Sequence, residues 1–187
     1  MNTIEKRLSV KNVKSGFGHD LMGLFADIYL DNKKVGHYND DGWGGEIDLQ
    51  LKTEAQKIVE DMMVENNVGK LLFEERGWGF LGSLDKVTMS IQIETTIFDL
   101  IKGVLEAKER KAFERKLAKD MVKGICVGTN DSYRTISFKD GDLPTMVRLR
   151  GAATLTNIIN MQIVPKINIA TERILNTNLK DLGINLD

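Results

Sequence analysis

Two segments in the first fifty residues have an apolar residue at every second position. Leu8 belongs to a first strand segment, apolar residues then stand two apart in residues 24–30 and again in residues 47–51, and residues 34–38 form the returning strand between them. An alternation of period two places one apolar set of side chains on one face of a sheet. Residues 31–32, Asp-Asn, lie between the second and third segments, and both residue types tolerate the positive φ that a tight hairpin turn requires. The N-terminal region is therefore predicted to be an antiparallel β-meander.

The spacing of apolar residues becomes helical at Thr53. Thr53 and Gln56 have the spacing of a capping box, in which two side chains bond the first free N–H groups of a helix. The apolar residues recur at intervals typical of a helix, at Ala55, Ile58, Val59, Met62 and Met63. A single apolar stripe of this kind predicts an amphipathic helix that covers one face of the meander.

The second half of the chain is predicted to contain a long helix, a hairpin and two shorter helices. Apolar residues in helical spacing extend from about residue 91 to residue 123. Two apolar segments then flank the polar residues 128–132, as in a β-hairpin. Pro144 suits the first turn of another helix. Residues 167–182 have the spacing of a short final helix that ends at Gly183.

These elements predict an α+β fold, in which an antiparallel β-meander is packed by an amphipathic helix and is followed by a long helix and a second β-hairpin. A chain of 187 residues has the length of one domain, so we expect a single domain over residues 1–187. Asparagine, which favours turns and caps, is frequent near the C-terminus. Residues 150–187 are therefore expected either to pack on the domain or to form a helical C-terminal extension.

The composition excludes several classes of protein. With 42% hydrophobic residues and 28% charged residues, the chain has an ordinary globular composition, so a disordered chain is excluded. The 26 Lys and Arg residues nearly balance the 27 Asp and Glu residues, which argues against a dedicated nucleic-acid coat protein. No segment is apolar enough for a membrane span or a signal peptide. We expect a soluble protein of a reducing cytoplasm, in a bacterial cell or a host cell taken over by a virus, with no membrane partner.

The segment from His37 to Asp48 combines acidic residues, glycines and Trp43. A calcium loop would have His37, a poor calcium ligand, in its first position and lacks flanking helices. A phosphate cradle would bring the anion close to Asp40, Asp41 and Glu46, which repel it. Two further interpretations are an inter-strand loop with glycines at positive φ and a partner-binding loop, since exposed tryptophans are typical interface anchors.

A second glycine-aromatic segment, Gly77-Trp78-Gly79-Phe80, poses a similar choice. Trp78 and Phe80 either fill the core or belong to a mobile contact loop. We select Trp43, Trp78 and Phe80 as candidate partner-binding residues.

The segment from residue 108 to residue 120 is locally basic. Six cations stand among three acidic residues, which fits either a solvated helix face or a helix that lies along phosphates. The candidate nucleic-acid contacts are Lys108, Arg110, Lys111, Arg115, Lys116 and Lys119.

Motifs for catalysis or metal binding are weak. His19 and His37 lack metal-ligand spacing, and no nucleophile-elbow motif occurs. Cys126 lies between Ile125 and Val127 and is expected to be a small buried side chain of a strand. We predict no catalytic residue, no metal ligand and no cofactor.

Residues 25–45 contain a recognisable signature. Tyr29, Asp31 and Lys33 match it within the segment from Phe25 to Gly36, and Asn39 to Gly45 continue it. This signature resembles that of small uncharacterised proteins of tailed phages and mobile elements. The later Tyr133-Arg134-Thr135 and Ile174-Leu175-Asn176 are also similar. The family has no established activity, so the resemblance implies no catalytic residue.

Three functions are compatible with these observations. The first is a non-enzymatic, phage-type accessory protein that binds a host protein, including one of a defence system. The second is a nucleic-acid-binding accessory protein that uses the basic segment. The third is a small-molecule or nucleotide binder, or an unrecognised enzyme, that uses the acidic glycine loop.

Overall fold

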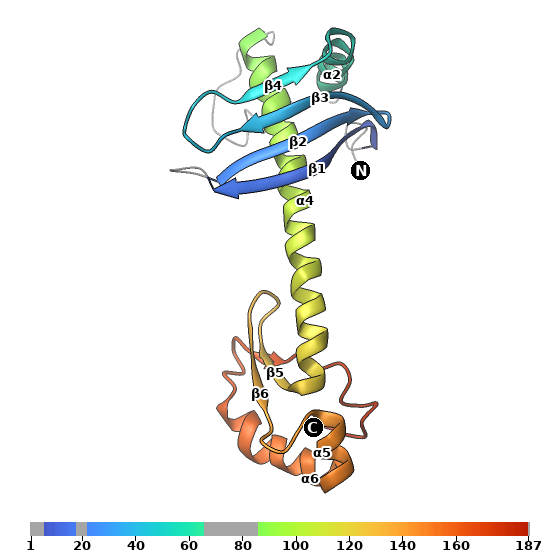
Figure 1. Ribbon diagram of the computed structural model, residues 1–187, viewed down its shortest axis with the longest axis vertical. Coiled ribbons are helices and arrows are strands. Elements are labelled where there is room, and N and C mark those ends of the chain that lie inside the picture. Colours follow the sequence, from blue (N-terminus) through green and yellow to red (C-terminus); the bar gives the residue numbers. More distant parts are fainter. Residues whose placement is uncertain (1–5, 18–21, 66–85, 187) are drawn as a thin grey trace. The chain divides into compact units, whose positions relative to one another are not determined.

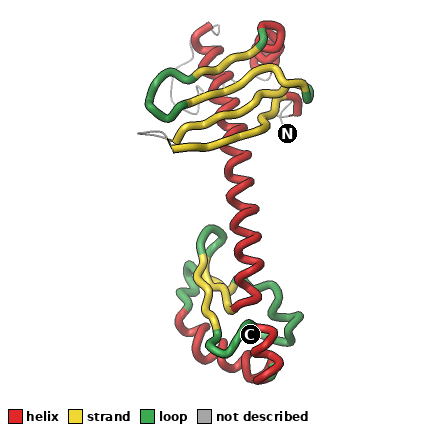
Figure 2. The backbone as a smooth tube through the Cα atoms, viewed as in Figure 1, coloured by secondary structure: helices red, strands yellow, loops and turns green. Residues whose placement is uncertain are grey.

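The computed structural model describes residues 6–17, 22–65 and 86–186 (Figures 1 and 2). The chain divides into two compact units, Met1–Ala107 and Lys108–Asp187, which we call the first and the second unit. A long helix, α4 (Lys86–Lys123), supplies residues to both units. The fold is mixed α+β, and the predicted order of meander, long helix and hairpin is confirmed.

The first unit contains a four-stranded antiparallel sheet in the order β1-β2-β3-β4. The strands are β1 (Leu8–Phe17), β2 (Met22–Leu30), β3 (Lys33–Asp40) and β4 (Asp48–Leu51). Asp31 and Asn32 join β2 to β3 with φ values of 49° and 66°, as the hairpin prediction requires. Each strand therefore pairs with its neighbour in the sequence, and the predicted meander is confirmed.

A β-bulge in β1 places a polar group over the carboxylate of Asp27. The register of β1 and β2 shifts between Lys11 and Lys14, and Asn12 there has a φ of 54°. Asn12 Nδ2 donates a hydrogen bond to Asp27 Oδ2 (2.8 Å), and Lys34 Nζ lies 2.7 Å from Asp27 Oδ1. The hydrogen bonds from Lys34 and Asn12 lower the pKa of Asp27, which is buried.

Two helices cover one face of this sheet, α2 (Thr53–Glu65) and the N-terminal half of α4 (Lys86–Lys123) (Figure 1). Their apolar residues and the inward side chains of the strands form one core, in which Ile28, Ile97 and Ile101 are fully buried. Ile58, which belongs to the predicted apolar stripe of α2, is exposed.

The predicted capping box of Thr53 and Gln56 at the start of α2 is wrong. The backbone N–H of Gln56 donates to Lys52 O, and the Gln56 side chain donates to Glu60.

The second unit contains a three-stranded antiparallel sheet in the order β6-β5-β7. Its strands are β5 (Gly124–Gly128), β6 (Tyr133–Ser137) and β7 (Arg173–Ile174), and its helices are α5 (Leu143–Arg150) and α6 (Ala152–Ile158). A π-helical segment (Ile159–Ile163) and a 3-10 turn (Val164–Lys166) follow α6. The predicted hairpin and the predicted helix at Pro144 are confirmed. Ile125, Leu155 and Ile159 are fully buried in a core of this unit's own.

The predicted final helix over residues 167–182 is wrong. This part of the chain contains β7, which pairs with β5, and turns. Asn176 explains the difference, because its side-chain oxygen accepts from Cys126 N (2.6 Å) and its amide donates to Met121 O (3.1 Å) and Gly124 O (3.0 Å). These long-range bonds to backbone groups hold the segment extended against β5 and the end of α4.

Candidate functional site

The loop between β3 and β4 is held by two successive aspartate turns. Asp40 Oδ1 accepts a hydrogen bond from Gly42 N, and Asp41 Oδ1 accepts one from Trp43 N, each at 2.9 Å. Side chains of Asp commonly fix a turn in this way, by bonding the backbone two residues further on. Gly42 and Gly44 have φ values of 73° and 77°, which favour glycine. The expectation of glycines at positive φ is confirmed here.

This loop presents Trp43 at the surface. The side chain is 63% exposed, although tryptophan is among the most apolar and most highly buried residue types on average. Three exposed acidic residues, Asp41, Glu46 and Asp48, lie in or next to the loop. The arrangement can offer a large flat apolar group within an acidic rim, which is the chemistry of a contact surface.

The other two predicted partner-binding residues, Trp78 and Phe80, lie outside the described residues. The choice between core and contact loop for their segment therefore stays a prediction, and Trp43 alone carries the site below.

The structure divides the basic segment of α4 into two sides. On one side, Arg110 Nε forms an ion pair with Glu114 (3.2 Å), and Lys116 Nζ lies 5.9 Å from the centre of the Tyr133 ring. Lys108, Lys111, Arg115 and Lys119 instead follow one another at intervals of three or four residues, so they share one face of the helix. We call these four residues the basic stripe. All of them are exposed.

The side of α4 opposite the basic stripe is fixed to the β5–β6 hairpin. The rings of Phe113 and Tyr133 meet edge to face with 5.3 Å between their centres, and Tyr133 Oη donates to Asp120 Oδ2 (3.0 Å). Burial and this bond raise the pKa of Tyr133 to about 12. Lys123 and Tyr133 together lower the pKa of Asp120. The phenol therefore stays protonated and the carboxylate charged across the physiological range.

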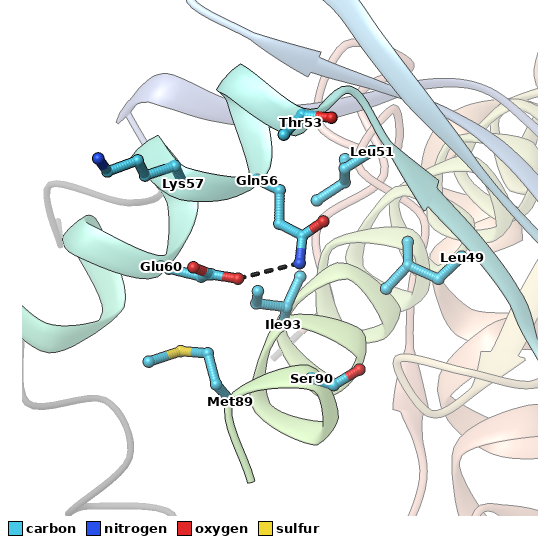
Figure 3. Close-up of a pocket in the computed structure, with 9 residues that line it drawn as sticks. All are labelled: Leu49, Leu51, Thr53, Gln56, Lys57, Glu60, Met89, Ser90 and Ile93. Carbon is cyan, nitrogen blue, oxygen red and sulfur yellow. Dashed lines mark hydrogen bonds between the residues drawn. The ribbon is translucent and has the colours of Figure 1, made fainter. Parts of the chain in front are cut away.

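A cavity of about 560 Å³ lies between β4, α2 and the start of α4 (Figure 3). The described residues that line it are Leu49, Leu51, Thr53, Gln56, Lys57, Glu60, Met89, Ser90 and Ile93. The side chains of Gln56 and Glu60 bond each other at 2.9 Å, as the dashed line in Figure 3 shows. Neither Trp43 nor any residue of the basic stripe lines this cavity, so it is separate from both candidate sites.

Two buried polar residues were not found from the sequence. Tyr38 Oη and both amide atoms of Gln92 have no hydrogen-bond partner among the residues that the structure describes. Burial, together with the negative charges of Asp40 and Glu94, raises the pKa of Tyr38 to about 12. Burial also raises the pKa of Glu94. The alternation of β3 places Tyr38 on the inward face, but no pattern in the sequence distinguishes Gln92 from the exposed polar residues of α4.

Cys126 is fully buried in β5, as the sequence predicts. Its Sγ lies 3.7 Å from Thr135 Oγ1, and burial raises the pKa of the thiol. A buried thiol with a raised pKa is a poor nucleophile. Over residues 6–17, 22–65 and 86–186, no three His, Cys, Asp or Glu side chains are grouped so that they could hold a metal ion.

Comparison with known proteins yields no match to a family model, a curated protein or a solved structure. The resemblance of residues 25–45 to phage proteins therefore stays a prediction. Among the described residues, no helix has the length and apolar character needed to cross a bilayer.

Proposed function

We propose that this chain is a non-enzymatic accessory protein that acts by binding another protein, with Trp43 as the anchor of the interface. The observation that carries this proposal is a tryptophan 63% exposed on a turn that two aspartates hold. A fixed turn lowers the conformational entropy lost on binding, and a tryptophan supplies a large contact area. Burial of such a residue in a partner's pocket is typical of binding hot spots.

The charges around Trp43 indicate the chemistry of the partner. Asp41, Glu46 and Asp48 are exposed in or next to the loop that carries Trp43, and the first unit as a whole has 18 acidic residues against 12 basic ones. A complementary partner has an apolar pocket bordered by Lys or Arg. Because rim charges mainly steer the encounter, the association rate is expected to fall as salt is added.

The origin of the partner rests on the resemblance of residues 25–45 to phage proteins. We propose that the partner is a protein of a bacterial host and that components of defence systems are the first class to test. The protein would then act in the host cytoplasm. This step depends on the resemblance alone, whereas the role of Trp43 does not.

The direct test is affinity capture from a bacterial lysate with the full chain and with Trp43→Ala. We expect the wild-type chain to retain a specific protein and Trp43→Ala to weaken that binding about 30-fold or more, the effect of losing a hot spot worth 2 kcal/mol or more. Val64→Ala is the matched control, because Val64 is a second exposed apolar side chain of the first unit, 56% exposed.

Purified partner and chain then give the affinities by calorimetry. Unchanged affinity of Trp43→Ala refutes the proposed anchor, as does an equal loss in Val64→Ala. Failure of the wild-type chain to retain any protein from the lysates of its hosts refutes the proposed function itself.

A further inference from the structure

The basic stripe forms a continuous line of positive charge on α4. At a rise of 1.5 Å per residue, Lys108 to Lys119 span roughly 16 Å, with a cation every 4.5 to 6 Å. The three acidic residues of this segment, Glu109, Glu114 and Asp120, lie about 100° or more around the helix from the centre of the stripe, given a step of about 100° per residue. No acidic side chain of the helix therefore neutralises the stripe from within its own face.

Contacts on the opposite side of α4 hold the basic stripe in place, and the stripe itself is exposed. Phe113 and Asp120 fix the opposite side of α4 to Tyr133, and Asn176 binds the carbonyl of Met121 at the helix end. Lys111, Arg115 and Lys119 form no ion pair with any other residue in the described part of the chain. These three cations of the stripe thus keep their charge for a ligand outside the unit.

The charge of the second unit favours a polyanionic ligand. Residues 108–187 contain 14 Lys and Arg against nine Asp and Glu, whereas the chain as a whole is nearly neutral. A strand of nucleic acid carries one phosphate per about 3.4 Å of helix axis. A cation about every 4.5 to 6 Å along the stripe is spaced closely enough for each cation to contact a phosphate of such a strand. An anionic membrane fits less well, because the side of α4 opposite the cations packs on the protein and offers no apolar face to lipid.

We infer that the basic stripe, Lys108, Lys111, Arg115 and Lys119, is a binding site for the phosphate backbone of nucleic acid. The contacts are to phosphates, so the site binds without sequence preference. This inference is independent of the proposed role of Trp43, which lies in the other unit.

Fluorescence anisotropy of the full chain with a short mixed-sequence DNA duplex tests the inference. Four phosphate contacts give a slope of log affinity against log salt of about −3.6, so affinity falls about 150-fold between 50 and 200 mM salt. The double variant Lys111→Gln/Arg115→Gln keeps two contacts, and its affinity is expected to fall only about 12-fold over the same range. At 50 mM salt it also binds more weakly than the wild type.

The matched control is Arg110→Gln/Lys116→Gln, which removes the same charge from the other side of the same helix. It is expected to keep the wild-type salt slope. Equal changes in both double variants would show an effect of net charge and overturn the site, as would the absence of duplex binding at 50 mM salt. Binding to phosphatidylserine vesicles without binding to DNA or RNA would also overturn it. Circular dichroism of each variant shows whether a loss of binding reflects a loss of folding. The single variants Lys111→Gln and Arg115→Gln are measured in the same way.

Discussion

The two units are built by different kinds of interaction. In the first unit, every strand pairs with its neighbour in the sequence, and alternating apolar residues fill the core beneath the sheet. In the second unit, Val127 of β5 pairs with Ile174 of β7, and Asn176 bonds three backbone groups near β5. A local hydrophobic pattern thus determines the first fold, whereas specific long-range polar contacts complete the second.

The units also differ in charge, and their candidate sites follow that difference. The first unit has 12 basic and 18 acidic residues and exposes Trp43 on a loop that also carries exposed acidic residues. The second has 14 basic and nine acidic residues and presents a line of cations. The near-neutral charge of the whole chain is therefore the sum of a net negative first unit and a net positive second unit.

The largest expected effect comes from truncating one buried side chain in the core of either unit. Ile97 and Ile159 are both fully buried, the first in the core of the first unit and the second in that of the second unit. Replacement of either by Ala is expected to destabilise its own unit by about 2–5 kcal/mol. Both tryptophans belong to residues 1–107, so tryptophan fluorescence during urea unfolding reports the first unit, whereas far-UV circular dichroism reports both.

Because each unit has its own core, we expect Ile159→Ala to lower the circular dichroism transition and leave the fluorescence transition in place. Ile97→Ala is expected to lower the fluorescence transition. Ile169→Ala is the control, since Ile169 is 82% exposed and its loss should change stability by less than about 0.5 kcal/mol. If Ile159→Ala instead lowers both transitions equally, the chain unfolds as the single domain that the sequence predicts.

The next effect is that of Asn176→Ala. The substitution removes the acceptor of the Cys126 N–H and one donor each from the carbonyls of Gly124 and Met121, although Asn178 still donates to Met121 O. A buried group left unpaired costs about 1–3 kcal/mol. We expect a lower urea midpoint by circular dichroism and an unchanged midpoint by fluorescence. Asn185→Ala removes an exposed asparagine of the same tail and should have little effect. Equal midpoints for the two variants would contradict the role given to Asn176.

This contrast explains what the sequence could predict. The alternation at residues 24–30, the turn at Asp31 and the spacing from Thr53 were sufficient for the meander and its covering helix, because these patterns act between neighbours in the chain. The tail could not be predicted in this way. The spacing of residues 167–182 fits a helix, but the bonds of Asn176 to groups some fifty residues earlier override it.

The sequence also indicates only part of each candidate site. The residue types of the loop and of the basic segment are enough to indicate Trp43 and six cations as candidates. The spacing of three or four residues is enough to place the four residues of the basic stripe on one helix face. The structure adds that Lys116 lies against the ring of Tyr133, which belongs to the hairpin. No sequence pattern specified that Tyr133 would lie against α4.

A smaller effect is expected from the pH dependence of Asp27. Lys34 and Asn12 lower the pKa of this carboxyl in the folded state, so the unfolded chain takes up the proton first as the pH falls. The stabilisation is therefore present above about pH 4 and is lost as the pH falls through the folded-state pKa. Asp27→Asn is expected to be less stable than the wild type at neutral pH and to lose less stability on acidification.

Urea midpoints followed by tryptophan fluorescence from neutral pH down to about pH 3 measure this effect. Asp31→Asn provides the comparison, because Arg7 also lowers the pKa of Asp31 but the pair is exposed and solvent screens it. We expect the change in acid sensitivity to be larger for Asp27→Asn than for Asp31→Asn. A wild-type pH profile in Asp27→Asn would rule out the contribution of its pair with Lys34.

The smallest expected effect concerns the two adjacent glycines of the Trp43 loop. A Cβ atom added at Gly44 or at Gly45 would have no atom within 4 Å, so packing does not distinguish them. Gly44 has a φ of 77°, which an L-residue adopts at a loss of about 1 kcal/mol, whereas Gly45 does not have a positive φ of this kind. Gly44→Ala should therefore lower the stability of the first unit by about 1 kcal/mol. Gly45→Ala should leave it unchanged or raise it slightly, because alanine restricts the unfolded chain. Tryptophan fluorescence measures both, and an equal response would show that the turn is not held in the conformation that presents Trp43.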